Sequence, residues 1–216
     1  MAALFRRWTN IAARATLIAV AGIVGGVPLA LMAWVRTPNA SGQFAPVPQP
    51  VPFDHVLHVK GFGIDCRYCH TAVERSATAG IPPTTTCVPC HSDTWMRSRE
   101  LAPVLLSLTS GQPLQWNRVH KLPDFVYFNH AIHVAKGVGC ETCHGRVDQM
   151  GRVYQAAPLT MGWCVDCHRD PTPYLRPRSE ITTMGWRPPI AQVALGRQLA
   201  TEYHVQRLTN CSTCHR

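Results

Sequence analysis

Cys66-Arg67-Tyr68-Cys69-His70 is the first of five stretches that decide how this chain folds. The other four are Cys87-Val88-Pro89-Cys90-His91, Cys140-Glu141-Thr142-Cys143-His144, Cys164-Val165-Asp166-Cys167-His168 and Cys211-Ser212-Thr213-Cys214-His215, and we number the five as motifs 1 to 5. Each is Cys-x-x-Cys-His, the attachment pattern for c-type haem, in which both thiols bond to the porphyrin and the histidine binds the iron. All ten cysteines belong to these motifs, so the sequence predicts five covalently attached haem c groups.

Cysteine pairs of this spacing also hold structural zinc or form redox-active disulfides. Neither use requires a histidine directly after the second cysteine, yet all five pairs have one. The chain has 11 histidines in 216 residues, so five such neighbours would arise by chance on the order of once in a million. The sequence therefore favours haem over both alternatives.

Five haems are a large load for a chain of this length. Residues 53–216 provide about 33 residues for each haem, too few to build a separate apolar core around it. We expect a mainly α domain with low regular secondary structure, whose core is largely haem. The 18 prolines agree with short helices joined by long loops.

The formal net charge is +9, before any haem propionates are counted. Arginine outnumbers lysine by 18 to 3, and guanidinium groups pair well with carboxylates. A basic chain can also bind nucleic acid, but no recognition motif accompanies the charge. We expect no nucleic-acid partner.

Residues 15–35 form a run of 21 positions without a charged side chain. As a helix this run would span about 31 Å, the thickness of a bilayer hydrocarbon core. Arg6, Arg7 and Arg14 precede it, which places the N-terminus in the cytoplasm. A cleaved signal peptide is the alternative, although its apolar region would be shorter, about 7–15 residues. We expect residues 1–36 to form a cytoplasmic stub and a single-pass signal anchor in the inner membrane, with the haem domain on the periplasmic side.

Beyond the anchor, the sequence predicts three further parts. Prolines at positions 38, 46, 48, 50 and 52 mark residues 37–52 as an extended linker. The chain then repeats the pattern Phe-x-His-x-x-His, first at residues 53–58 and again at residues 128–133, each time ahead of two motifs. We therefore expect a first two-haem unit with a connector over residues 53–127 and a second unit with three haems over residues 128–216.

Each haem iron has two axial positions, and the motif histidines His70, His91, His144, His168 and His215 fill one on each. We expect the second positions to be filled by His55, His58, His120, His130 and His133, with His204 left over in a helix predicted at residues 190–208. Histidines three residues apart on a helical turn project in offset directions, so each should serve a different iron. A methionine in one of these positions is the alternative, with Met150, Met161 and Met184 as candidates. Irons with two protein ligands have no open position for a substrate, which favours electron transfer over catalysis.

The Phe-x-His-x-x-His pattern resembles that of the small multihaem cytochromes of the c3/c7 class. In that class the two histidines are distal ligands of two different haems. The resemblance implies the same role for His55 and His58, and for His130 and His133.

A longer resemblance covers nearly the whole chain. Residues 116–133 (WNRVHKLPDFVYFNHAIH), the stretch Met161-Gly162-Trp163-Cys164, and five motifs behind one N-terminal membrane helix are similar to the pentahaem cytochrome c subunit of bacterial alternative complex III. The resemblance implies a quinol-oxidising membrane complex with three kinds of partner: an iron–sulfur subunit similar to molybdopterin oxidoreductases, polytopic quinol-binding membrane subunits, and a monohaem cytochrome c. It also implies that His120, which stands inside the matching run, is an iron ligand.

We therefore expect a non-catalytic electron-transfer subunit that passes electrons along five haems to a downstream cytochrome or other carrier. One alternative is a self-sufficient membrane-anchored quinol dehydrogenase that feeds a periplasmic reductase. Another is a multihaem reductase of a small inorganic substrate, which would need an iron with an open position.

Overall fold

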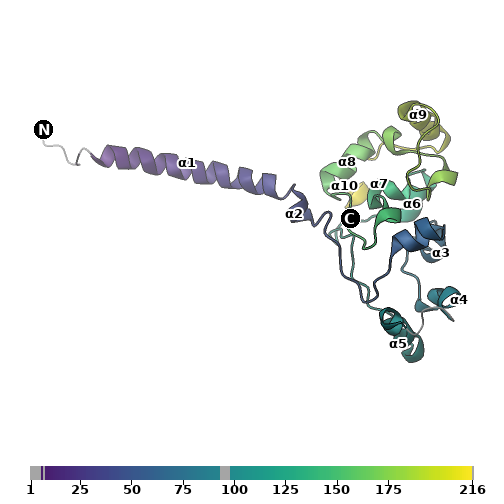
Figure 1. The fold of residues 1–216 in the computed structure, drawn as a ribbon. Coiled ribbons are helices and arrows are strands. Elements are labelled where there is room, and N and C mark those ends of the chain that lie inside the picture. Colours follow the sequence, from purple (N-terminus) through teal and green to yellow (C-terminus); the bar gives the residue numbers. More distant parts are fainter. Residues whose placement is uncertain (1–5, 7, 93–97, 216) are drawn as a thin grey trace. The chain divides into compact units, whose positions relative to one another are not determined.

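The computed structural model describes residues 6, 8–92 and 98–215. Arg7, one of the predicted flanking charges, lies outside the described residues. The chain divides into two compact units, Met1–Gln43 and Phe44–Arg216, each with its own internal contacts (Figure 1). The two units are described separately below.

The first unit is dominated by one long helix, α1 (Trp8–Trp34), which includes Pro28 and has no buried residue. An 18-residue window of this helix has a mean hydropathy of 2.1, and its 27 residues are long enough to cross a membrane. A membrane anchor and a signal sequence share these properties, so the anchor remains a prediction. After α1 comes a single turn, α2 (Pro38–Ser41), which ends at Gly42 in the left-handed conformation with φ 71°.

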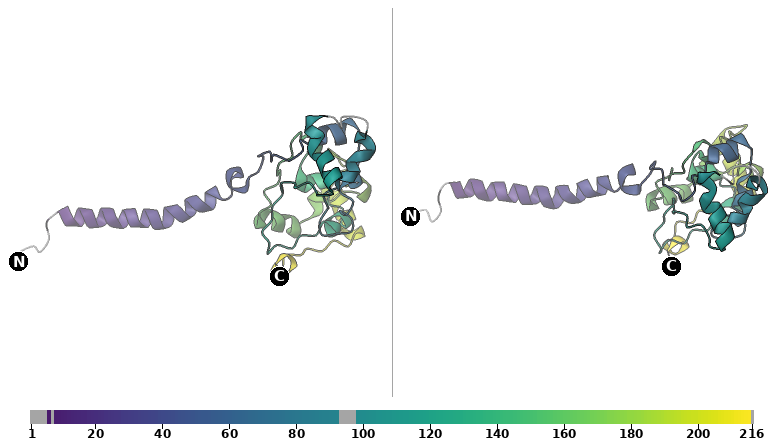
Figure 2. Two further views of the ribbon diagram at one scale, coloured as in Figure 1. Left: turned by 90° about the horizontal axis from the view of Figure 1, so that it is seen from below. Right: turned by 60° about the horizontal axis from the view of Figure 1, so that its bottom comes forward.

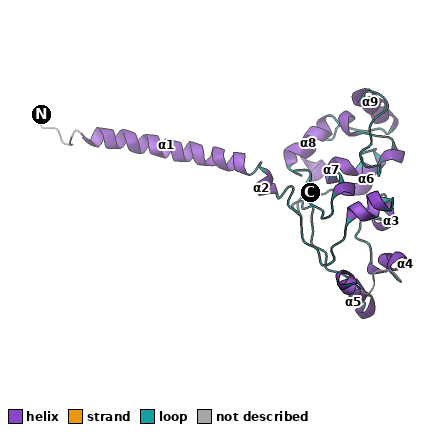
Figure 3. Ribbon diagram, viewed as in Figure 1, coloured by secondary structure: helices purple, strands orange, loops and turns teal. Residues whose placement is uncertain are grey.

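The second unit consists of short helices joined by long loops, and Figure 3 shows no strand among the described residues. Two isolated β-bridges join Val126 to His215 and Val138 to Leu175. The mainly helical fold with little regular structure, predicted from the sequence, is confirmed, and both views in Figure 2 show it. The helices are η1 (Val56–Gly61), α3 (Cys66–Cys69), η2 (Thr84–Cys87), α4 (Val88–His91), η3 (Arg99–Leu101), α5 (Ala102–Ser110), α6 (His130–Ala135), α7 (Cys140–His144), η4 (Val147–Gln149), α8 (Met161–Arg169), η5 (Thr172–Tyr174), η6 (Arg178–Glu180), α9 (Gln192–Glu202) and α10 (Cys211–Cys214).

The buried apolar side chains cluster around α9, which packs against η5. The cluster contains Leu175, Leu195, Leu199 and Tyr203. The five motif helices, α3, α4, α7, α8 and α10, have no fully buried residue. The motif helices therefore contribute no side chain to this cluster.

Part of the predicted linker is bonded to the second unit. The amide of Phe44 donates to the carbonyl of Gln155 at 3.0 Å, and the amide of Val47 donates to that of Val153 at 3.2 Å. Further on, the Gln49 side chain exchanges two hydrogen bonds with the backbone of residue 117, and Val51 is buried. Residues 44–52 thus form a strap along the unit, while the predicted domain boundaries remain predictions.

The helix predicted over residues 190–208 is shorter than expected. α9 begins at Gln192 and ends at Glu202, and His204 adopts the left-handed conformation with φ 50°. The Lys136 ammonium donates to the carbonyls of Tyr203 and His204 at 2.7 and 3.3 Å. A cation on the last carbonyls stabilises a helix end at this point.

Candidate haem-binding site

The two repeated turns that carry paired histidines have nearly identical geometry. Phe53 stacks on His58, with ring centroids 4.2 Å apart and planes 28° apart, and meets His55 edge-on at 4.8 Å and 81°. In the second turn, Phe128 stacks on His133 at 4.5 Å and 28°, and meets His130 at 4.8 Å and 88°. In each turn the phenylalanine therefore holds both imidazoles in place. The sequence indicated this role, because the phenylalanine recurs at the same position in both copies of Phe-x-His-x-x-His.

The residue after each phenylalanine holds the turn in shape. The Asp54 carboxylate accepts the amide of Val56 at 2.7 Å, and the Asn129 side chain accepts the amide of Ile132 at 3.4 Å. The carbonyls of Asp54 and Asn129 each contact the Nδ1 of the second histidine of their turn at 2.7 Å. These caps were not predicted from the sequence, although Asp and Asn are both typical of such positions.

The same Nδ1 contact occurs at five of the ten predicted ligands. Since Nδ1–H donates to a carbonyl, the other ring nitrogen, Nε2, is left unprotonated and can bind a metal. A fixed tautomer of this kind is typical of metal-binding histidines. The five contacts are His58 to Asp54, His70 to Gly80, His130 to Ala77, His133 to Asn129 and His215 to Phe125, at 2.7 to 3.2 Å.

Three motif histidines face a histidine of the repeated turns across a gap of one size. A metal–imidazole bond is about 2 Å long, so two imidazoles on opposite sides of one iron have ring centres about 6 Å apart. The observed pairs agree with that spacing. They are His58 with His91 at 6.2 Å, His130 with His144 at 6.2 Å, and His133 with His168 at 6.0 Å.

At motif 1, His55 and His70 are close enough to influence each other's charge. Burial lowers the pKa of His55 to about 4, and nearby His70 lowers it further than any other side chain. The Nδ1 atoms of His55 and His91 are buried without a hydrogen-bond partner. His55 is therefore held neutral, the form of imidazole that binds a metal. The residues fit bis-histidine haem at motifs 1 to 4.

His120 and His215 do not form such a pair. His120 lies against His144, with its Nε2 3.2 Å from the His144 Nδ1. The ring of His215 contacts Phe125 at 5.7 Å, and His204 is exposed beyond the end of α9. Of the candidate methionines, Met150 is buried and Met161 is 70% exposed at the start of α8. The second ligand at motif 5 remains a prediction.

The motifs are neighbours in a definite order. A hydrogen bond between the thiols of motifs 1 and 3 lowers the pKa of Cys66 and raises that of Cys140. Burial, then the Cys87 thiol of motif 2, raises the pKa of Cys69. The pKa of Cys143 is raised to about 12, first by burial and then by Cys167 and Cys164 of motif 4. The pKa of Cys164 is raised first by burial and then by Cys214 of motif 5. Interacting thiols thus link motif 2 to motif 1, motif 1 to motif 3, motif 3 to motif 4 and motif 4 to motif 5. We write this sequence of neighbours as the order 2, 1, 3, 4, 5.

Hydrogen bonds between segments agree with this order. Asp65, which caps the helix of motif 1, accepts the Thr182 hydroxyl at 2.9 Å, and the neighbouring Ile181 carbonyl accepts the amide of Cys140 in motif 3 at 3.0 Å. The carbonyl of Cys214 in motif 5 accepts the amide of Tyr127, one residue before the second ligand turn, at 2.8 Å.

The alternative uses of the cysteines gain no support. Within residues 6, 8–92 and 98–215, no group of three or more His, Cys, Asp or Glu side chains comes together in a way that could hold a metal ion. None of the ten cysteines is joined to another in a disulfide. Structural zinc would need four such ligands around one point.

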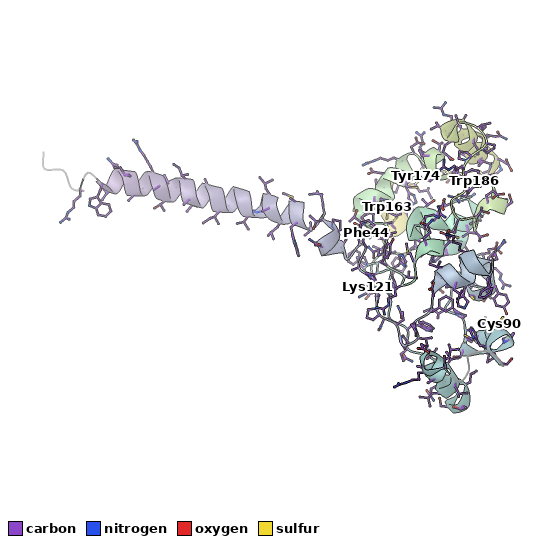
Figure 4. The ribbon with its side chains drawn as sticks, in the orientation of Figure 1. Phe44, Cys90, Lys121, Trp163, Tyr174 and Trp186 are labelled. Atoms are coloured by element: carbon purple, nitrogen blue, oxygen red, sulfur yellow. The ribbon has the colours of Figure 1, made fainter. Side chains whose placement is uncertain are left out.

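The loop that follows motif 4 wraps around motif 3. The buried Arg176 guanidinium donates to Glu141, inside motif 3, at 2.8 Å and to the carbonyls of Glu180 and Thr183 at 3.3 and 3.1 Å. Glu141 also accepts the amide of Gly185 at 2.6 Å. Tyr174 and Trp186, both labelled in Figure 4, line an open cavity of about 500 Å³ beside these groups. One ion pair thus ties the loop to a haem-attachment helix.

Two comparisons with known proteins bear on this site. Residues 126–216 match the family model described as cytochrome c7 and related cytochrome c. A stretch of 97 residues is 37% identical to the protein named menaquinone reductase, multiheme cytochrome c subunit, from Nitratidesulfovibrio vulgaris strain Hildenborough. That stretch covers 44% of this chain and 45% of the relative, so the match spans less than half of either protein.

Residues 126–216 are therefore similar to c7-type multihaem cytochromes, and their motifs are of the kind that attaches haem covalently. The matched region contains α6 and motifs 3 to 5. The c3/c7 part of the expectation is confirmed. The named relative belongs to a menaquinone reductase, so alternative complex III itself is not supported.

Proposed function

We propose that this chain is the electron-transfer subunit of a membrane-bound quinone oxidoreductase. It would carry five haems on the extracytoplasmic side and exchange electrons between quinone-binding membrane subunits and a redox protein outside the membrane. The partners proposed are an iron–sulfur subunit similar to molybdopterin oxidoreductases, polytopic quinone-binding subunits and a monohaem cytochrome c. The haems supply one-electron chemistry, and the chain supplies their ligands and spacing.

The observation that supports the proposal is the facing of histidines at motifs 2, 3 and 4. Irons with a histidine on each side have no position for a substrate. The chain's own residues hold each imidazole in one tautomer, through Nδ1 contacts and through stacking on Phe53 and Phe128. Rigidly held ligands of this kind suit a carrier that changes only its charge.

Two directions of electron flow are open to such a subunit. The similarity of residues 116–133 to alternative complex III favours quinol oxidation, whereas the name of the matched relative points to reduction of menaquinone. The purified complex distinguishes them. Menaquinol with an oxidised cytochrome tests one direction, and a reduced cytochrome with menaquinone tests the other, with the faster rate naming the reaction.

The proposal itself is tested on the complex purified in mild detergent. We expect five haems per chain by pyridine haemochrome assay, low-spin signals at motifs 1 to 4 by electron paramagnetic resonance, and haem reduction by menaquinol or by a reduced cytochrome. A high-spin haem at one of these four motifs that binds added cyanide would contradict it.

The self-sufficient quinol dehydrogenase is separated by a second measurement. We expect the isolated full-length chain in lipid not to be reduced by menaquinol, because between Thr16 and Trp34 the helix α1 presents only apolar side chains. Reduction of the isolated chain at the rate of the complex would favour that alternative.

A further inference from the structure

We propose that His120 serves motif 3 by accepting a hydrogen bond from its histidine, His144, instead of binding an iron. On this assignment His120 is a positioning residue that makes His144 a more basic ligand. The inference rests on the proposed haem-binding function of the motifs, and it replaces the expectation that His120 is a distal ligand.

The distance between the two rings excludes a shared iron. The His120 Nε2 and the His144 Nδ1 are 3.2 Å apart, with ring centroids at 4.3 Å and planes at 76°. Two imidazoles on opposite sides of one iron would have ring centroids about 6 Å apart, well beyond the 4.3 Å seen here. At 3.2 Å the pair is at hydrogen-bond distance, and the perpendicular rings present one edge nitrogen to the other.

The opposite partner of His144 is already supplied. The His130 ring lies nearly parallel to that of His144, with an interplanar angle of 13° and centroids 6.2 Å apart, which is the spacing of two imidazoles across an iron. His130 in turn directs its Nδ1 to the carbonyl of Ala77 at 2.8 Å. His120 therefore approaches His144 from a different side than His130 does.

The other predicted ligands show what the His120 contact replaces. At five of them the Nδ1 atom faces a backbone carbonyl oxygen, and at His144 the same atom faces an imidazole nitrogen. An imidazole nitrogen is a stronger proton acceptor than an amide oxygen, so it draws the Nδ1 proton further and increases the basicity of Nε2. A more basic axial ligand stabilises the oxidised iron, which lowers the reduction potential.

The chain holds His120 in place from the strap at residues 44–52. Asn117 donates its side-chain amide to the carbonyl of Pro48 at 2.7 Å, and its backbone amide donates to the Gln49 side chain at 2.9 Å. Arg118 then donates to the carbonyl of His120 at 3.1 Å. These bonds fix the segment on both sides of residue 118 and leave the His120 ring free to meet His144.

The test compares His120→Leu and His120→Gln with the wild-type complex, using haem content, spin state and a potentiometric titration. Leucine removes the acceptor, whereas the glutamine side-chain oxygen can still accept a hydrogen bond. We expect both variants to have the same number of haems as the wild type and the same spin state at each haem. One midpoint potential should rise in His120→Leu while the others stay in place, and the rise should be smaller in His120→Gln.

His204→Leu is the matched control, because His204 is an exposed histidine beyond α9, and we expect no change in spin state or potential. Conversion of one haem to high spin in either His120 variant would overturn the inference and make His120 an iron ligand. Unchanged potentials in His120→Leu would overturn it as well. If the leucine variant incorporates fewer haems, the spin state of His120→Gln decides. A wild-type complex that neither menaquinol nor a cytochrome reduces would contradict the proposed function instead.

Discussion

At the scale of single residues, motif 3 is fixed by the ion pair of Arg176 and Glu141. Both side chains are largely buried, at 8% and 15% exposure, and Arg176 packs directly against the Cα of Gly139, the residue before the motif. Removing one member of a buried pair leaves the other charge without compensation. Glu141 would keep the Gly185 amide and Arg146 at 4.0 Å, which compensate its charge in part. We expect Arg176→Ala to lower the free energy of unfolding by about 2–3 kcal/mol, measured by guanidinium denaturation of the full-length chain in detergent.

Arg169 and Asp166 provide the matched control. Their side chains form an ion pair of similar length, 3.0 Å, but remain 67% and 69% exposed. Exposed pairs contribute about 0–1 kcal/mol, so Arg169→Ala should leave the unfolding free energy nearly unchanged. Equal losses in the two variants would contradict the role assigned to burial.

Asp65 should make stability depend on acid. Hydrogen bonds from Arg67, which outweigh the effect of burial, lower the pKa of Asp65 from 3.8 to about 2. Because the folded pKa lies below the unfolded one, the stabilisation is fully present above about pH 4 and is lost as the pH falls toward 2. Unfolding measured between pH 6 and 2 should show a shallower loss in this range for Asp65→Asn. Identical slopes in both proteins would rule the contribution out.

At the scale of elements, the closest packing is that of α9 on η5. A methyl group on Gly196 would fall on the carbonyl oxygen of Thr172, so only glycine allows this approach. We expect Gly196→Ala to lower the free energy of unfolding by about 1–3 kcal/mol, through forced separation of the two helices. Thermal or denaturant unfolding followed by far-UV circular dichroism measures it.

Gly61→Ala in η1 is the corresponding control. The nearest atoms to an added methyl group there are 3.6 and 3.7 Å away, which is ordinary contact. The change should be small, within about 0.5 kcal/mol, or slightly stabilising. A large loss at Gly61 would show that glycine replacement as such, and not the contact with η5, causes the effect.

The ligand turns show how far the sequence could be interpreted. The repeated Phe-x-His-x-x-His pattern predicted two equivalent turns, and the structure gives both the same ring geometry. The placement of His120 could not be predicted. Comparing the number of histidines with the number of axial positions shows that there are enough ligands, but it does not show where each histidine lies. The end of α9 was missed for a related reason. It depends on Lys136, a residue far away in the sequence that contacts the helix only in the folded chain.

At the scale of the whole molecule, the proposed anchor makes a simple prediction. We replace residues 1–43 with a cleavable signal peptide and express the chain without its partners. The second unit should then appear, with covalent haem, in the soluble extracytoplasmic fraction, since no described helix outside α1 is long and apolar enough to span a bilayer. Haem staining of fractionated cells measures this.

The wild-type chain, expressed in the same way, should remain with the membranes after a carbonate wash. Release of the wild-type chain into the soluble fraction would contradict the anchor and favour a cleaved signal sequence.

The fold class and the five motifs could be predicted from the sequence, whereas the order of the motifs could not. That order depends on contacts such as Cys66 with Cys140, which lie far apart along the chain.

On the proposed function, haems attached at the motifs in the order 2, 1, 3, 4, 5 would pass electrons in series. Every electron would then pass through each step between neighbouring haems, and the slowest step would limit the rate through all five. If electron transfer between motifs 1 and 3 were lost, the two haems of motifs 1 and 2 could no longer exchange electrons with the three haems of motifs 3 to 5. The haems of motifs 2 and 5 would be the two ends of this series. Electron donors and acceptors would then exchange electrons with these two haems.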